Sequence, residues 1–296
     1  MKPRMKLPQN QIYAVILGIM QDGGLPHIGC HCHRCSAAYK DPQASQYTAC
    51  LGIIDQRRHP LRIWLIDATP DIKYQLELLG DMLGGHPEMP GRLRQPDGIF
   101  LTHAHMGHTA GLAQLGPEGM NVHDLPLYAS DKLINKLLGM EIWGPLVNNL
   151  SLTPLKPGIS IELAPELTIT PIPVIHRDEI GAGTFAYLCS GPSRSLLYLP
   201  DIDQWDSFTE TRAALGIVNV ALVDASFFSQ QELGGRPPVA HPLVSDTITY
   251  WAGSSTQLIL THINHTNPIL DEKSEARQEV DMAGVTVART GEVFPL

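Results

Sequence analysis

The chain has 296 residues, a formal net charge of −9, 43% hydrophobic residues and 17% charged residues. This composition excludes an intrinsically disordered chain, because such chains are poor in apolar residues and rich in net charge. The negative charge and the lack of a cluster of lysines and arginines argue against a nucleic-acid partner, since phosphate binding requires clustered cations. No linker separates two parts, and we therefore expect a single domain over residues 1–296.

The N-terminal segment carries Lys2, Arg4 and Lys6 before an apolar run at positions 13–19, which raises the question of a secretory signal. The run is short, contains Gly18 and is followed by Gln-Asp-Gly-Gly without a small-residue cleavage site, so it is more typical of a first β-strand. Nothing else approaches the ~18 uninterrupted apolar residues that a membrane span requires. We expect a soluble, cytoplasmic protein without a membrane partner.

Short apolar runs rich in β-branched residues recur along the chain, and helical stretches alternate with them. The predicted strands are 13–18, 61–66, 98–102, 125–129, 167–175, 184–189, 195–199, 218–223 and 257–261. The predicted helices are 71–82, 107–115, 131–140, 242–252 and 273–283. This alternation predicts a layered α/β fold. Segments rich in glycine and proline, such as 84–96 and 234–238, are expected to form surface loops.

Three of the five cysteines lie in the segment Cys30-His31-Cys32-His33-Arg34-Cys35, after the first predicted strand. They are too closely spaced for a disulfide scaffold across a chain of this length, and a metal site explains them better. Three thiolates from one loop supply most of a structural zinc site, which needs a fourth protein ligand. The alternative is three free thiols, and we expect the two interleaved histidines to face solvent. Cys50 and Cys189 lie in apolar runs and are expected to be buried.

The segment Thr102-His103-Ala104-His105-Met106-Gly107-His108 follows the predicted strand 98–102. Residues two apart in an extended chain point the same way, so His103 and His105 leave the strand on one face, and His108 follows from the next turn. Imidazole is the commonest protein ligand for zinc-type ions, and three imidazoles within six residues predict a metal site. The alternative is a chance cluster of polar loop histidines.

Three later strands each end in one further potential ligand. The strand at 167–175 leads into His176, the strand at 195–199 leads into Asp201, and the strand at 257–261 leads into His262. Taken singly, each has a structural alternative: a surface histidine, a helix cap and a loop histidine, respectively. Because strand-end loops carry function on a rigid frame, four strands that end in this way predict one site at one sheet edge.

These residues, in this order, resemble the metallo-β-lactamase superfamily, whose signature is His-x-His-x-Asp-His. The cysteine segment and the segment 261–272, which contains His262 and His265, also resemble two branches of that family. The branches are the pyrroloquinoline quinone biosynthesis B proteins and the cyclic-phosphate phosphodiesterases of phosphonate metabolism. The resemblance spans nearly the whole chain and implies a four-layer αβ/βα sandwich of the metallo-β-lactamase type, with two metals at one edge of the facing sheets.

The resemblance implies that three histidines hold one metal and two hold the second, with one carboxylate bridging both ions and taking part in catalysis. These residues are His103, His105 and His176 for the first metal, His108 and His262 for the second, and Asp201 for the bridge. Two metals in this arrangement activate a water and bind an oxyanion, which is two-metal hydrolysis.

One departure from the signature concerns the second metal. Gly107 occupies the position of the aspartate that binds this metal in the family. The loss removes one ligand and one negative charge, so we expect the second ion to bind weakly or to be completed by another residue. Asp22 and Asp178 are candidates, and spacing does not distinguish them.

Three further roles are implied by the resemblance. His265 is expected to be the fourth ligand of a zinc held by Cys30, Cys32 and Cys35, joining an N-terminal to a C-terminal loop. His241 is expected to protonate the leaving group, because the pKa of imidazole lies near the operating pH; the alternative is a plain loop histidine. Asp67 is expected either to support the histidine segment or to cap a helix.

Two principal functions are compatible with these features. The first is a metal-dependent hydrolase that uses a metal-activated water on a small phosphodiester or ester-type substrate. The second is an iron-dependent oxidative enzyme of the pyrroloquinoline quinone biosynthesis B type; a metal-binding paralogue without catalysis is a third reading, motivated by Gly107. We expect one or two zinc ions at the active site and one structural zinc, with iron or manganese as alternatives at the active site. A homodimer is compatible with the resemblance, and the sequence leaves assembly open.

Overall fold

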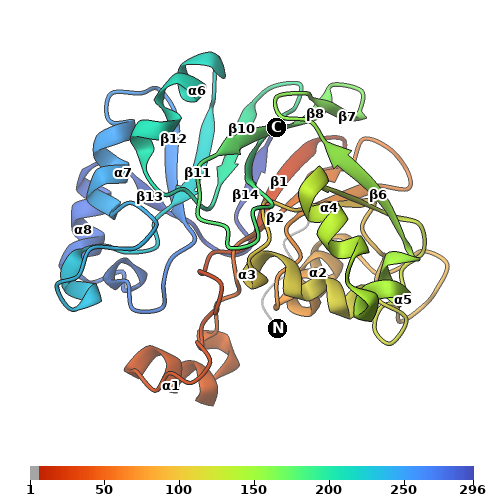
Figure 1. Cartoon of the computed structure of the whole chain (residues 1–296), viewed down its shortest axis with the longest axis horizontal. Coiled ribbons are helices and arrows are strands. Elements are labelled where there is room, and N and C mark those ends of the chain that lie inside the picture. The colour runs from red at the N-terminus through yellow and green to blue at the C-terminus, as the bar shows by residue number, and fades with distance from the viewer. Residues whose placement is uncertain (1–6) are drawn as a thin grey trace.

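The structure, a computed structural model, describes residues 7–296 (Figure 1). Lys2, Arg4 and Lys6, which raised the question of a signal segment, lie outside the described residues. Over the described part, two seven-stranded sheets lie between outer helices. This arrangement confirms the predicted αβ/βα sandwich. Among the described residues, no helix has the length and apolar character needed to cross a bilayer.

The first sheet has the strand order β14-β1-β2-β3-β4-β5-β6. Its strands are β14 (Val293–Pro295), β1 (Ile12–Gly18), β2 (Cys50–Asp55), β3 (Arg62–Ile66), β4 (Gly98–Phe100), β5 (Leu125–Ser130) and β6 (Leu150–Leu155). Neighbouring strands pair in parallel from β3 to β6, and in antiparallel fashion from β14 to β3.

The second sheet has the strand order β13-β12-β11-β10-β9-β8-β7. Its strands are β13 (Thr286–Val287), β12 (Gln257–Thr261), β11 (Val220–Asp224), β10 (Ser195–Leu199), β9 (Thr184–Ser190), β8 (Leu167–Val174) and β7 (Ile161–Ala164). The strands from β10 to β13 are parallel and those from β7 to β10 are antiparallel. Each sheet therefore has a parallel part whose strand ends share one edge.

Helices cover the outer face of each sheet. The α-helices are α1 (His33–Lys40), α2 (Ile72–Leu83), α3 (Met106–Thr109), α4 (Asp131–Leu138), α5 (Gly144–Val147), α6 (Thr209–Ala214), α7 (Val244–Trp251) and α8 (Glu275–Met282). Helices α2 and α4 pack on the first sheet, and α7 and α8 pack on the second. Helix α1 lies apart from these layers, at the end of an N-terminal excursion (Figure 1).

The alternation of side chains along β1 shows how the core is divided. Ile12, Ala14 and Ile16 point between the sheets, where they join side chains of the second sheet such as Tyr187. The intervening residues, including Val15, face the helical layer. All seven residues of β1 are buried, because both faces of the strand are covered. This explains why the run is apolar throughout.

All the predicted strands are present, although β4 ends at Phe100 and β11 extends to Asp224. Strands β2, β6, β7, β13 and β14 and the helices α1, α5 and α6 were not predicted. The prediction of one helix over 107–115 was wrong, because the chain forms the short helix α3 and then a 3₁₀ segment, Ala110–Leu115. The predicted helix 273–283 begins later, since Ser274 caps α8 by accepting a hydrogen bond from the Arg277 N–H.

Candidate metal centres

The candidate site is formed by residues at the C-terminal ends of six strands. The side chains come directly after β3, β4, β8, β10 and β12, and from the last residue of β11. In chain order they are Asp67, the histidines of segment 102–108, His176, Asp201, Asp224 and His262. Because strands of the two sheets end at a common edge, residues far apart in the chain meet there. The rings of His108 and His262, for example, lie 5.5 Å apart.

His103, His105 and His176 form the first ligand group, and their ligand atoms all lie within 4.8 Å of one another. The Nδ1 atom of His105 lies 3.4 Å from Nε2 of His176. Two nitrogens bound to one tetrahedral zinc lie ~3.3–3.4 Å apart, given zinc–nitrogen bonds of about 2.0–2.1 Å. The Nδ1 atom of His103 contacts the Thr102 hydroxyl at 2.9 Å, which leaves its Nε2 free to face the group.

His108, His262 and the carboxylates of Asp201 and Asp22 form the second group. The Nε2 atoms of His108 and His262 lie 3.2 Å and 3.5 Å from Oδ2 of Asp201. The same two nitrogens lie 3.3 Å and 3.6 Å from Oδ1 of Asp22. These separations again match ligands placed around one ion rather than hydrogen-bonded pairs.

Asp201 lies between the two groups and turns one oxygen toward each. Its Oδ1 is 3.5 Å from Nε2 of His176, while its Oδ2 faces His108 and His262. Burial would raise the pKa of this carboxyl, but the surrounding imidazoles outweigh burial and hold the pKa well below its usual range. Asp201 is therefore an ionised carboxylate in the position of a bridge.

Buried polar atoms without hydrogen-bond partners test whether a metal fits. They include Nε2 of His103, His108 and His262, Oδ1 of Asp22 and Oδ2 of Asp201. Leaving such atoms unpaired costs about 1–3 kcal/mol each, more for a charged group. A divalent cation would satisfy these atoms together, because imidazole and carboxylate are ligands of zinc-type ions. The residues present thus fit a divalent metal.

Asp67 holds His108 in place by contacting the ring nitrogen that faces away from the second group. Its carboxylate accepts hydrogen bonds from the backbone N–H and the hydroxyl of Thr102, at 2.8 Å and 2.9 Å, and lies 2.7 Å from Nδ1 of His108. This contact directs Nε2 of His108 into the second group. Of the two roles open for Asp67, the structure shows support of the histidine segment.

His241 lies beside both groups and is held by Asp224, a fully buried carboxylate. The distance from His241 Nδ1 to Asp224 Oδ2 is 2.6 Å, and the His241 ring lies 5.2 Å from that of His176 and 5.5 Å from that of His262. Burial lowers the pKa of His241, but the Asp224 carboxylate outweighs it and raises the pKa to about 9. Asp224 was not predicted, although it ends an apolar strand just as the recognised ligands follow theirs.

The structure distinguishes the two candidates for the missing carboxylate. Asp22 is in the second group, whereas the Asp178 carboxylate accepts hydrogen bonds from the backbone N–H groups of Ile180 and Gly183. Burial raises the pKa of Asp22, but His108 and His262 outweigh burial and lower it far below its usual range. Asp22 is thus an anion facing both imidazoles.

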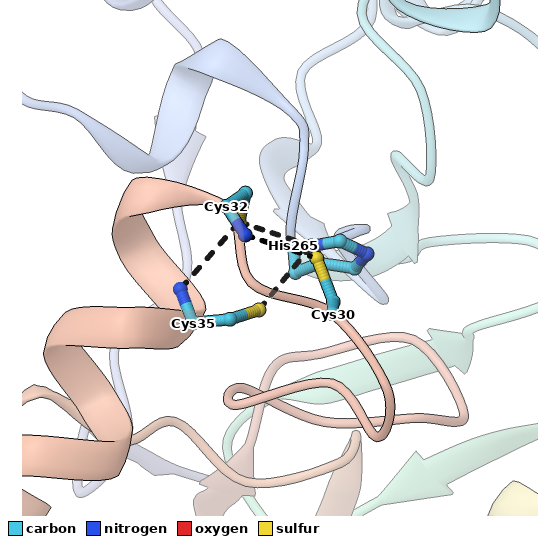
Figure 2. Close-up of side chains that lie close together, drawn as sticks. All are labelled: Cys30, Cys32, Cys35 and His265. Carbon is cyan, nitrogen blue, oxygen red and sulfur yellow. Dashed lines mark hydrogen bonds between the residues drawn. The ribbon is translucent and has the colours of Figure 1, made fainter.

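The cysteine segment and His265 form a separate cluster, in which the three sulfurs lie around Nδ1 of the imidazole (Figure 2). The distances to His265 Nδ1 are 3.9 Å from Cys30 Sγ, 3.7 Å from Cys32 Sγ and 3.5 Å from Cys35 Sγ. A tetrahedral zinc with bonds of 2.3 Å to sulfur and about 2.05 Å to nitrogen separates these atoms by ~3.6 Å. The cluster therefore has the dimensions of a closed zinc site.

The other histidines and cysteines lie where the sequence predicts them. His31 and His33 are exposed, and Cys50 and Cys189 are buried. The structure thus brings all the predicted site residues into two clusters, one at the sheet edge and one between the N-terminal loop and the loop after β12. Asp22 and Asp224 also belong to the sheet-edge cluster. Metal binding by either cluster stays a prediction.

Comparison with known proteins agrees with the resemblance seen in the motifs. The Beta-lactamase superfamily domain matches residues 62–263. A coenzyme PQQ synthesis protein B from Pseudomonas entomophila is 28% identical, with 95% of this chain and 98% of that protein covered. The corresponding protein from Nitrosococcus oceani is 26% identical, with 93% and 97% covered.

Two solved structures share this fold over nearly their whole length. The zinc-bound PqqB from Methylobacterium extorquens has a TM-score of 0.81 at 22% identity, covering 96% of this chain and 100% of that chain. A diphosphatase from the PhnP family has a TM-score of 0.70 at 22% identity, covering 97% of each chain. The sandwich fold is therefore shared with both proteins.

The contact between Asp67 and His108 predicts a stability effect. Asp67→Asn keeps the size of the side chain but removes the charge that Thr102 and His108 face, so we expect the free energy of unfolding to fall by about 1.5–3 kcal/mol. Urea unfolding with chelator present measures this without a contribution from bound metal. Asp178→Asn, at a half-buried carboxylate that accepts two backbone hydrogen bonds, is the control and should cost less. Equal losses would contradict the supporting role of Asp67.

The cysteine cluster predicts a metal count. Cys32→Ser should remove one equivalent of metal per chain and lower the melting temperature, because a serine oxygen is a poor replacement for a zinc-bound thiolate. Metal analysis and thermal unfolding measure the two effects. Cys189→Ala removes a buried thiol in β9 and should leave the metal count unchanged. Full metal content in Cys32→Ser would exclude a metal site at this cluster.

Proposed function

We propose that this chain, which belongs to the beta-lactamase superfamily, is a metal-dependent hydrolase that acts on a small phosphodiester or ester-type substrate. The observation that carries the proposal is the pair of adjoining ligand groups that share Asp201. The Nε2 atoms of His103, His108 and His262 are buried without hydrogen-bond partners. The His105 and His176 nitrogens lie at the separation expected of two ligands around one metal. His241 lies beside both groups, where a substrate held there would meet it.

We propose that the ligand residues divide between two ions. His103, His105 and His176 would hold one ion, and His108 and His262 would hold the other, with Asp201 between them. Divalent metals bound in this way supply Lewis-acid catalysis and an activated water. Zinc suits this donor set and that of the cysteine cluster, and iron or manganese are alternatives at the histidines.

The chain's own proton donor is His241. Asp224 holds its Nδ1 at 2.6 Å, so the proton available for transfer is on Nε2. The same carboxylate favours the charged imidazole, since it raises the pKa of His241 to about 9. In its charged form His241 can protonate a leaving oxygen, while Asp224 holds the ring in position.

The proposed substrate is small. A net charge of −9 disfavours close approach of a long polyanion such as RNA, whose binding depends on clustered cations. Two bound ions, together with a charged His241, would provide local positive charge for a single phosphate or carboxylate-like group. We propose a small-molecule substrate and neither a nucleic-acid nor a membrane partner.

A second candidate function follows from the curated relatives. The coenzyme PQQ synthesis B proteins match 93–95% of this chain at 25–28% identity, and imidazole and carboxylate ligands also suit iron. An iron-dependent oxidative step in the synthesis of a quinone cofactor is the alternative to hydrolysis. Metal analysis of protein purified without added metal separates the two: we expect zinc, and stoichiometric iron at the histidine centre would favour the oxidative reading.

The hydrolase proposal is tested with bis(p-nitrophenyl) phosphate, a generic phosphodiester. We expect His105→Ala to lower turnover by about 100-fold or more, because the first group then loses one of its three imidazoles. His123→Ala removes an exposed histidine far from the centre and should retain activity. If the wild-type protein and His105→Ala behave alike, hydrolysis at this centre is wrong. Absence of turnover in the fully metal-loaded protein would support the paralogue without catalysis.

The role of His241 predicts a dependence on the leaving group. His241→Gln should slow cleavage of an alkyl phosphodiester by about 10²–10⁴-fold, because an alkoxide must be protonated as it leaves. Cleavage of an aryl ester should fall much less, since p-nitrophenolate leaves without a proton. The aryl substrate thereby controls for folding and metal content. Equal losses on both substrates would show that His241 does not act as the proton donor.

A further inference from the structure

We propose that Asp22 provides the second metal with the carboxylate that Gly107 cannot, so that the ligand has moved from the start of α3 to the loop after β1. The inference deepens the proposed function and rests on it only in requiring a divalent cation between His108 and His262. The observation behind it is that Asp22 fills the space beside residue 107 and turns an oxygen toward both imidazoles.

The first argument is the position of the Asp22 carboxylate. Its Oδ1 lies 3.3 Å from His108 Nε2 and 3.6 Å from His262 Nε2, and all three atoms are buried without hydrogen-bond partners. Oδ2 of Asp201 also faces these two nitrogens, at 3.2 Å and 3.5 Å. Two imidazoles and two carboxylates make a four-ligand set with two negative charges, which matches a divalent ion.

The second argument is the reason for a glycine at position 107. A Cβ atom built on Gly107 would overlap Oδ1 of Asp22 and lie 2.6 Å from its Cα, far inside the ~3.5–4.0 Å of ordinary carbon contacts. Gly107 has no positive φ angle, so its backbone conformation does not require glycine. It also lies in the short helix α3, a conformation that does not favour glycine. The close contact with Asp22 explains why residue 107 is a glycine.

The third argument is that the Asp22 loop is fixed against the loop of His262. The Gln21 N–H donates to the carbonyl of Ile263 at 3.0 Å, and the Ile263 N–H donates to the carbonyl of Ile19 at 2.8 Å. The Thr48 hydroxyl contacts the Asp22 carbonyl at 3.5 Å. These backbone contacts hold Asp22 next to His262, so the carboxylate needs no rearrangement to bind an ion.

The two positions are therefore sterically exclusive. A side chain at 107 and the Asp22 carboxylate occupy the same space, and either can present an oxygen to the second ion. On this inference the second site has its full set of ligands, and the weak binding expected from Gly107 alone does not follow.

Metal stoichiometry and calorimetric titration with zinc test the inference without any activity assay. We expect three equivalents in the wild-type chain, two at the sheet edge and one at the cysteines. Asp22→Asn keeps the side-chain size and should retain two equivalents of zinc. Removal of a hydrogen-bond partner of a ligand costs ~10–100-fold in metal affinity, and we expect the loss of a ligand itself to lower the affinity of the second site by at least as much. Asp178→Asn is the matched control and should retain three.

The proposed relocation of the carboxylate from position 107 to position 22 is tested by returning it to position 107. Gly107→Asp alone should lower the melting temperature, because the new side chain overlaps Asp22. Asp22→Gly combined with Gly107→Asp should restore both the melting temperature and three equivalents of metal. If the double variant does not fold, Asp22→Asn still decides the question, and circular dichroism confirms that this variant is folded.

The outcomes separate this inference from the proposed function. Full zinc affinity in Asp22→Asn, or a folded double variant with only two equivalents, would overturn the inference alone. Three equivalents in a wild-type protein that hydrolyses no phosphodiester would refute the hydrolase and leave the role of Asp22 supported. A wild-type chain that binds zinc only at the cysteines would overturn both.

Discussion

The structure of the sheet edge depends on a buried charge, the carboxylate of Asp201. It has to stay ionised without contact with solvent, and only the imidazoles around it make this favourable. One oxygen faces His176 and the other faces His108, so the same group sets the separation of both ligand groups. The position of Asp201, at the end of β10 in the middle of the second sheet, determines where the rest must converge.

The surrounding contacts orient the ligands rather than adding to their number. Asp67, Thr102 and Ser226 each contact a ring nitrogen of a ligand histidine on the side away from the centre. Such partners fix the ring and leave the opposite nitrogen to face the ion. Asp224 contacts Nδ1 of His241 in the same way, and His241 is the proposed proton donor. One fold edge thus positions both kinds of chemistry.

The sequence allowed prediction of those parts of the site that depend on local order. His103, His105 and His108 are local in the chain, and His176, Asp201 and His262 follow apolar strands, so strand periodicity places them. Asp224 directly follows the predicted strand 218–223, so the same pattern could have identified it, but it was not selected. Asp22 could not be selected, since its role depends on a contact with Gly107, 85 positions away by 107 − 22, that no local pattern encodes. The strands β6, β7 and β13 were missed for a similar reason: they are short or half-exposed, and pairing with neighbours defines them.

The spread of the ligands along the chain implies an order of assembly. Three of the four groups of the cysteine cluster lie within positions 30–35, so an unfolded or nascent chain can bring them together at a small loop-closure cost. The sheet-edge ligands are scattered from 22 to 262 and meet only after both sheets have formed. An ion can therefore be captured at the cysteines early, whereas the sheet edge can be loaded only after the chain has folded, and chelation there should strip the ion from a protein that keeps its fold.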